Sequence, residues 1–135
     1  MTLHNKIIWI TGASSGIGKS LAISLSKCNC KLILSARRIA LLETVKSQCQ
    51  KPENVVVLPL NLENITSMQA VTMQAIDAFG RVDMLINNGG ISQRSAIIDT
   101  DISVDRKIIE IDYLGTIALT KALLPHFVAQ NKGHF

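Results

Sequence analysis

The residues with the clearest chemical potential lie in the stretch TGASSGIG at positions 11–18. An apolar run at 6–10 precedes this stretch and a helical pattern at 16–28 follows it, so it is expected to turn from a strand into a helix. Such a turn suits a phosphate, because its glycines admit an anion close to the backbone and the helix N-terminus offers unpaired N–H groups. The alternative is a tight turn that binds no ligand. The residues predicted to serve phosphate binding are the three glycines and the two serines between them: Gly12, Ser14, Ser15, Gly16 and Gly18.

The end of the second expected strand bears on which dinucleotide this turn would hold. A carboxylate at that place would accept hydrogen bonds from the ribose 2′-hydroxyl of NAD(H). The sequence instead places Arg37 and Arg38 there. Guanidinium groups suit a 2′-phosphate through paired, charge-assisted hydrogen bonds, so the pattern favours NADP(H) over NAD(H). The alternative is that Arg38 is simply solvated on the first turn of the next helix.

Strands and helices alternate along the sequence, which is typical of parallel strands joined by crossover helices. Gly80 is expected to end the third helix, and Pro125 to kink or locally break the last one. We therefore predict an α/β fold with a doubly wound parallel sheet of the Rossmann type, incomplete because residues 133–135 lead into a fifth strand that does not follow. Residues 1–135 would form one dinucleotide-binding domain or its N-terminal part. The remaining expected elements are strands at 31–35, 55–60 and 82–86, and helices at 39–50, 67–79, 104–109 and 113–130.

Composition narrows the class of protein. The 14 basic and 10 acidic residues give a net charge of +4 with no block of like charges, so nucleic-acid binding is not expected. The three cysteines lack metal-ligand spacing and are expected to be reduced thiols, and no metal site is predicted. No apolar run approaches the ~20 residues of a membrane-spanning helix, and no targeting pattern precedes the first strand, so the expected location is the cytoplasm.

Two motifs together, TGASSGIG at 11–18 and NNGG at 87–90, closely resemble the short-chain dehydrogenase/reductase family, and the resemblance covers essentially the whole chain. It implies an oxidoreductase that moves hydride between a nicotinamide cofactor and a small-molecule carbonyl or alcohol substrate. The stretches SARR, NNGGISQRS and DYLGTIALTK are similar to a branch that acts on carbonyl and steroid-like substrates. A homo-oligomer of the full-length form also fits the resemblance.

The resemblance adds further cofactor contacts. It implies that Ile17 lies against the pyrophosphate, and that Asn88 and Gly89, with Gly90 beside them, stabilise the sheet and touch the adenosine ribose. Asn61 and Leu62 stand where the family has Asp followed by a hydrophobic residue. Asn61 could still accept a hydrogen bond from the adenine amino group, but a weaker one, because the charge of the carboxylate is gone.

The family's catalytic residues are matched at one place only, and there with a change. Asp112 stands where the family has Asn, which holds a water that links the catalytic lysine to solvent. An aspartate would retune proton transfer at that lysine. The alternative is that Asp112 merely caps a helix beginning near Tyr113. The family's Ser and Tyr-x-x-x-Lys have no counterpart in residues 1–135, where Tyr113 is the one tyrosine.

Three hypotheses follow. The first is an NADP(H)-dependent oxidoreductase of which this chain is the N-terminal part, inactive as it stands, or a degraded gene copy. The second is a noncatalytic nucleotide-binding module, and the third is a chain that keeps the fold without binding nucleotide. If the sheet is incomplete, part of the apolar face of the last helix should be exposed, favouring association. The residues of that face are Leu114, Ile117, Leu119 and Leu123.

Overall fold

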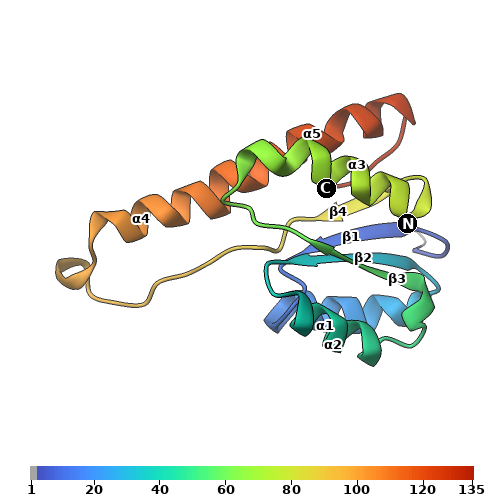
Figure 1. The fold of residues 1–135 in the computed structure, drawn as a ribbon, viewed down its shortest axis with the longest axis horizontal. Coiled ribbons are helices and arrows are strands. Elements are labelled where there is room, and N and C mark those ends of the chain that lie inside the picture. Colours follow the sequence, from blue (N-terminus) through green and yellow to red (C-terminus); the bar gives the residue numbers. More distant parts are fainter. Residues whose placement is uncertain (1–2) are drawn as a thin grey trace.

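The computed structural model describes residues 3–135 and contains one parallel four-stranded sheet (Figure 1). The strand order is β3-β2-β1-β4, so the sheet grows in one direction from β1 to β3 and then reverses to place β4 on the other side of β1. Each strand is a short, mostly aliphatic run, as expected where helices cover both faces of a sheet. The strands are β1 (Ile7–Thr11), β2 (Lys31–Ala36), β3 (Val55–Pro59) and β4 (Met84–Ile86).

Helices cover the two faces of the sheet and enclose two separate cores. Helices α1 (Gly16–Leu25) and α2 (Ile39–Gln48) pack on the face that buries Ile8, Ile10 and Leu34. Helices α3 (Met68–Phe79) and α5 (Thr116–Ala129) pack on the face that buries Trp9, Ile33 and Leu85. The prediction of a doubly wound α/β sheet is therefore confirmed.

Short 3₁₀ turns fill several of the connections. The first helix was expected to continue to residue 28, but α1 ends at Leu25 and one such turn carries the chain to Asn29, which adopts a left-handed conformation (φ 54°). The third helix ends as predicted, because Gly80 at φ 80° forms its left-handed C-cap. The 3₁₀ turns span Ser26–Cys28, Pro52–Asn54, Ile65–Ser67 and Ile97–Asp99.

The last two expected helices form one continuous helical segment, which corrects the sequence-based boundaries. Helix α4 (Ile102–Ile108) runs into a π-helical turn (Ile109–Gly115) and then into α5. The segment begins at Asp101, whose carboxylate accepts a hydrogen bond from the backbone N–H of Ser103 at 2.8 Å. No helix begins near Tyr113, so the interpretation of Asp112 as a helix cap is wrong. In Figure 1, α4 and the loop leading into it extend away from the body of the sheet.

The structure changes two expectations about the last helix: the break at Pro125 is absent, and part of the apolar face expected to be exposed is covered. Helix α5 passes through Pro125 without a break. Leu119 and Leu123 are both 0% exposed, because α3 and the sheet cover them, whereas Leu114 is 37% exposed. Of the four residues on the face expected to be partly exposed, Leu119 and Leu123 are therefore buried, Ile117 is half-buried and Leu114 is exposed.

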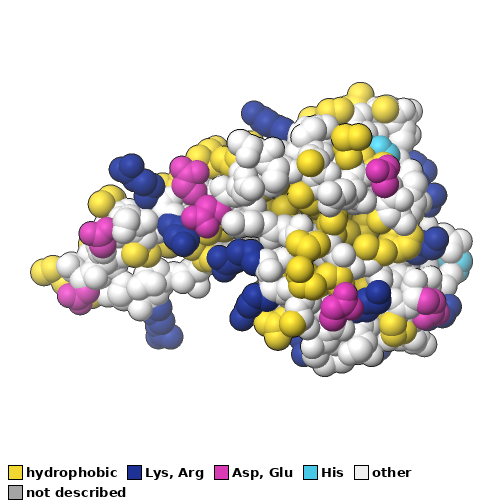
Figure 2. All heavy atoms as spheres, viewed as in Figure 1, with side chains coloured by type: hydrophobic (Ala, Val, Ile, Leu, Met, Phe, Trp, Pro, Cys, Tyr) yellow, Lys and Arg dark blue, Asp and Glu magenta, His cyan; other side chains and the backbone are white. Residues whose placement is uncertain are grey.

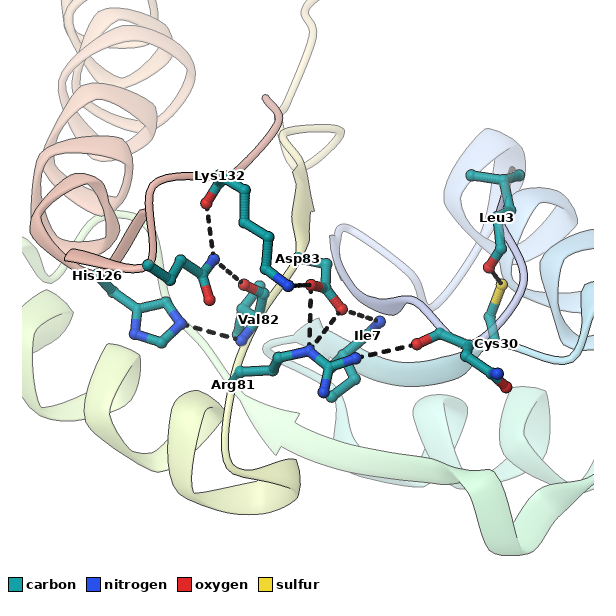
Figure 3. A network of polar contacts seen from close by, with 10 residues as sticks. Leu3, Ile7, Cys30, Arg81, Val82, Asp83, His126 and Lys132 are labelled. Atoms are coloured by element: carbon teal, nitrogen blue, oxygen red, sulfur yellow. Dashed lines mark hydrogen bonds and ion pairs between the residues drawn. The ribbon is translucent and has the colours of Figure 1, made fainter. Parts of the chain in front are cut away.

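A polar network holds the end of the sheet where β1 and β4 begin (Figure 3). The buried Asp83 carboxylate accepts hydrogen bonds from the Ile7 backbone N–H at 2.9 Å and from Arg81 Nε at 3.0 Å. Burial tends to raise the pKa of Asp83, but the Ile7 N–H and the Arg81 guanidinium outweigh it, and the pKa lies below its ordinary value. The chain after α5 returns to lie beside β4, since the His134 carbonyl accepts a hydrogen bond from the Leu85 N–H at 2.9 Å.

The surface carries basic and acidic side chains interspersed over the body and over the extended α4 region (Figure 2). Within residues 3–135, no helix is long and apolar enough to cross a membrane, and no cluster of His, Cys, Asp or Glu could hold a metal ion. All three cysteines are free thiols, and burial raises the pKa of the Cys30 and Cys49 thiols, which favours their protonated form.

Candidate cofactor-binding site

A cleft of about 530 Å³ opens at the carboxyl ends of the strands. It spans the point where the strand order reverses, with β2 on one side of β1 and β4 on the other. This is the general position of ligand sites in open α/β sheets, because the connections leave in opposite directions there and open a crevice. Every residue predicted to touch the cofactor lines this cleft except Gly18. Those that do are Gly12, Ser14, Ser15, Gly16, Ile17, Arg37, Arg38, Asn61, Leu62, Asn88, Gly89 and Gly90.

The three glycines of the turn have different physical reasons to be glycine. Gly12 has φ +64°, and a Cβ there would lie 2.8 Å from the Gly89 Cα, so both conformation and space exclude a side chain. Gly16 has φ +54° but no atom within 4 Å of an added Cβ, so its surroundings are open on the cleft side. Gly18 is buried against the Gly12 carbonyl and the Asn88 amide, and its part is close packing rather than lining the cleft.

Thr11 and Asn88 fasten the glycine-rich turn to the end of β4. The Thr11 hydroxyl accepts hydrogen bonds from the backbone N–H of Asn88 at 3.0 Å and of Gly89 at 2.8 Å. The Asn88 amide donates in return to the Thr11 carbonyl at 3.0 Å and the Gly12 carbonyl at 3.3 Å. Because bonds run in both directions between the two segments, the floor of the cleft is fixed without any ligand.

The cleft walls favour an anion. Ser15 is the N-cap residue of α1 and Arg38 that of α2, and neither helix has a side-chain capping hydrogen bond or an acidic residue in its first turn. Arg37 and Arg38 are exposed and form no ion pair within the described chain. None of the residues lining the cleft is Asp or Glu. The positive ends of two helices and two guanidinium groups therefore meet no protein carboxylate there.

The Asn61 side chain lies at the far end of the cleft, just beyond β3. Its Oδ1 accepts a hydrogen bond from the Glu63 backbone N–H at 3.2 Å, as Asn often does in a turn. The neighbouring Leu62 is buried, and its Cδ1 would lie 2.9 Å from a Cβ placed on Gly89. Asn61 is thus an exposed polar group on an otherwise apolar, tightly packed segment.

Asp112 stands outside the cleft lining and holds one of its walls. On the π-helical turn, its Oδ1 accepts a hydrogen bond from the Ile91 N–H at 2.8 Å. Its carboxylate also lies against Gly90, where an added Cβ would approach Oδ1 to 3.1 Å. The carboxylate therefore positions the segment after NNGG, a contact that sequence spacing did not predict.

Sequence reasoning missed several residues of the cleft. Ser35 and Ala36 directly precede Arg37 and Arg38 in the sequence, so their place in the cleft could have been predicted from that of the arginines. Ser35 is fixed there, since its hydroxyl accepts a hydrogen bond from the buried Trp9 indole at 2.8 Å. Ile111 carried no signal, because it reaches the cleft from the π-helical turn of a helix distant in sequence. The remaining lining residues are Thr11, Leu60, Ile91 and Ser92.

The fold and the position of the cleft are those of the Rossmann class. The family model described as short chain dehydrogenase matches residues 6–135, so the chain belongs to the short-chain dehydrogenase family. Its resemblance to that family, inferred from two motifs, is confirmed.

Two curated relatives illustrate the similarity. The human dehydrogenase/reductase SDR family member 7 is 48% identical over 136 residues, which cover 97% of this chain and 40% of the relative. The Drosophila melanogaster dehydrogenase/reductase SDR family protein 7-like is 42% identical, over 98% of this chain and 42% of the relative. The chain thus spans about two fifths of the length of these relatives.

Solved structures share the fold. A short-chain dehydrogenase from Streptomyces avermitilis aligns with a TM-score of 0.87 at 29% identity, covering 98% of this chain and 48% of that one. The 3-ketoacyl-(acyl-carrier-protein) reductase from Brucella melitensis complexed with NADH aligns with a TM-score of 0.86 at 26% identity, covering 95% and 52%.

Proposed function

We propose that residues 1–135 form the dinucleotide-binding part of an NADP(H)-dependent oxidoreductase that acts on a small-molecule carbonyl or alcohol. One observation carries the proposal: the cleft at the strand-order reversal combines a glycine-rich turn with Arg37 and Arg38 and has no lining carboxylate. Membership of an oxidoreductase family supports the reaction class. The relative from Brucella melitensis, complexed with NADH, supports a nicotinamide dinucleotide as the ligand class.

The residues present fit such a ligand. Gly16 leaves open space beside the uncapped N-terminus of α1, which suits a pyrophosphate against backbone N–H groups. Arg37 and Arg38 would hold the 2′-phosphate beside the uncapped N-terminus of α2. When bound, the cofactor supplies or accepts the hydride. This chain's residues bind and orient it, and Asp112 fixes the Gly90–Ile91 wall of the cleft.

Titration calorimetry with NADPH and NADH tests the cofactor assignment. Arg37→Asp should weaken NADPH binding about 10- to 100-fold, because a charge-assisted hydrogen bond contributes about 1.5–3 kcal/mol. NADH has no 2′-phosphate, so its binding should change by less than about threefold. Arg106→Asp makes the same charge change on α4, outside the cleft lining, and should leave both affinities unchanged. Equal losses of NADPH and NADH binding with Arg37→Asp would refute the phosphate site.

The competing function is a noncatalytic nucleotide-binding module. Residues 1–135 contain no Tyr-x-x-x-Lys, and the Asp112 carboxylate already accepts a hydrogen bond from the Ile91 N–H. Turnover assays with NADPH and a panel of aldehydes and ketones separate the two functions. Reduction of any carbonyl by the protein would exclude the noncatalytic module, whereas tight NADPH binding without turnover would support it.

A further inference from the structure

The Asn61 amide is the polar group at the far end of the cleft, just beyond β3. A hydrogen bond from the backbone sets its orientation. The Glu63 N–H can only donate, so the Asn61 atom 3.2 Å from it must be the oxygen. The amide nitrogen, Nδ2, is then the atom left to meet a ligand. In the described chain Nδ2 has no hydrogen-bond partner, and the side chain is exposed.

The position of Asn61 relative to the other cleft residues places it beside the purine base of a bound dinucleotide. In a Rossmann-type site the pyrophosphate lies on the glycine-rich turn after the first strand, and the ribose 2′-position lies at the end of the second strand. Here those positions are Gly16 and Arg37, and β3 is the next strand outward. Asn61 follows β3, so it stands where the purine of a bound dinucleotide would lie. This step rests on the proposed function.

From this geometry we propose that Asn61 presents a hydrogen-bond donor to the purine, so that the site does not select for the 6-amino group of adenine. Adenine can meet the donor through a ring nitrogen, and hypoxanthine can meet it through its 6-oxo group. The second lone pair of Oδ1 could accept from an amino group, but that neutral, shared acceptor is weaker than a carboxylate. The site then binds a dinucleotide with a 6-oxopurine about as well as one with adenine.

The side chains on either side of Asn61 supply no acceptor for the amino group. Leu60 and Leu62, on either side of it, are buried apolar residues. The guanidinium groups of Arg37 and Arg38 are donors only. No carboxylate lines the cleft, so selection for adenine by a charged acceptor is absent from the described site.

The test compares NADPH with reduced nicotinamide hypoxanthine dinucleotide phosphate, each titrated calorimetrically into the purified protein. The wild-type dissociation constants should agree within about threefold. Asn61→Asp should favour NADPH by at least about tenfold, because a carboxylate accepts strongly from the amino group and repels the 6-oxo oxygen. Asn64→Asp adds the same charge in the same turn, outside the cleft lining, and should leave the ratio unchanged.

Each outcome bears on a separate claim. If the wild-type protein prefers NADPH by more than about tenfold, the inference is overturned, and this holds even if Asn61→Asp fails to fold. An unchanged ratio in folded Asn61→Asp would also overturn it. Failure of the wild-type protein to bind either dinucleotide would instead overturn the proposed function, and the inference with it.

Discussion

Two buried threonines allow one chemical change to be tested in opposite contexts. Thr11 and Thr72 are each 1% exposed. The Thr11 hydroxyl accepts from the Asn88 and Gly89 N–H groups and donates to the Ile86 carbonyl at 3.3 Å. The Thr72 hydroxyl, inside α3, has no hydrogen-bond partner within the described residues. Replacing either residue with Val exchanges a hydroxyl for a methyl group of similar size.

The expected effects have opposite signs. Thr11→Val leaves two N–H groups without their acceptor, and each costs about 1–3 kcal/mol when buried. Both groups border an open cleft that admits water, so we expect a total loss of about 2–3 kcal/mol. Thr72→Val removes a hydroxyl that is desolvated without compensation, and Thr and Val have similar helix propensities. It should therefore stabilise the protein by about 1 kcal/mol.

Urea denaturation followed by the fluorescence of Trp9, the one tryptophan, measures both effects. With a slope of about 1–3 kcal/mol per M, the midpoint should fall by about 1 M for Thr11→Val and rise by about 0.5 M for Thr72→Val. A loss of stability in Thr72→Val would mean that its hydroxyl has a partner in solution. A neutral Thr11→Val would refute the idea that this hydroxyl fastens the turn to β4.

Three further predictions address other parts of the molecule. Asp83→Asn should destabilise by about 2–4 kcal/mol, because an amide leaves Arg81 without its charged partner, while exposed Asp77→Asn should change stability by less than about 0.5 kcal/mol. The pKa of Asp83 is lowered in the folded protein, so the ionised carboxylate adds to stability above the unfolded pKa of about 3.9, and this stability is lost as pH falls through the folded pKa. In thermal melts between about pH 7 and pH 2, the melting temperature of Asp83→Asn should therefore fall less steeply with acid than that of the parent. Gly16→Ala should lower the free energy of unfolding by about 1 kcal/mol in a melt, because residue 16 has a φ of +54°. Its loss of NADPH binding free energy should be larger than this, since the added methyl group enters the cleft. Asp112→Ala should destabilise by about 1–2 kcal/mol by removing the acceptor of the Ile91 N–H, whereas Asp112→Asn, which keeps an acceptor oxygen, should be within about 0.5 kcal/mol of the parent.

The parts of this molecule that local physics determines were predictable from its sequence. Apolar runs bounded by polar turns gave the four strands within about two residues, a typical error for such boundaries. The turn at 11–18 was recognisable because its glycines are needed for backbone conformation and close approach, which no other residue supplies. Arg37 and Arg38 follow directly from the end of β2, so their place at the cleft mouth needed no knowledge of tertiary contacts.

What could not be predicted depends on contacts between segments far apart in sequence. The pattern at 102–129 suggested two helices, because the π-helical turn shifts the spacing of apolar residues between α4 and α5. Leu119 and Leu123 were expected to need a cover from a later segment, but α3 already packs on them, and the order in which helices cover a sheet is not encoded in spacing.

The case of Asp112 shows how such a contact changes a functional argument. Considered locally, an aspartate before a helical pattern is a cap, and by resemblance it is a catalytic position. The fold excludes Asp112 as a helix cap, because the helix is continuous there. It also gives the carboxylate a hydrogen-bond partner 21 residues away, the Ile91 N–H. A carboxylate or an amide oxygen can both accept that hydrogen bond, so this contact alone does not require the charge. If the charge has a role, that role must concern a group that approaches Asp112 when substrate and cofactor are bound, and the comparison of Asp112→Asn with Asp112→Ala in stability and in NADPH binding separates the two contributions.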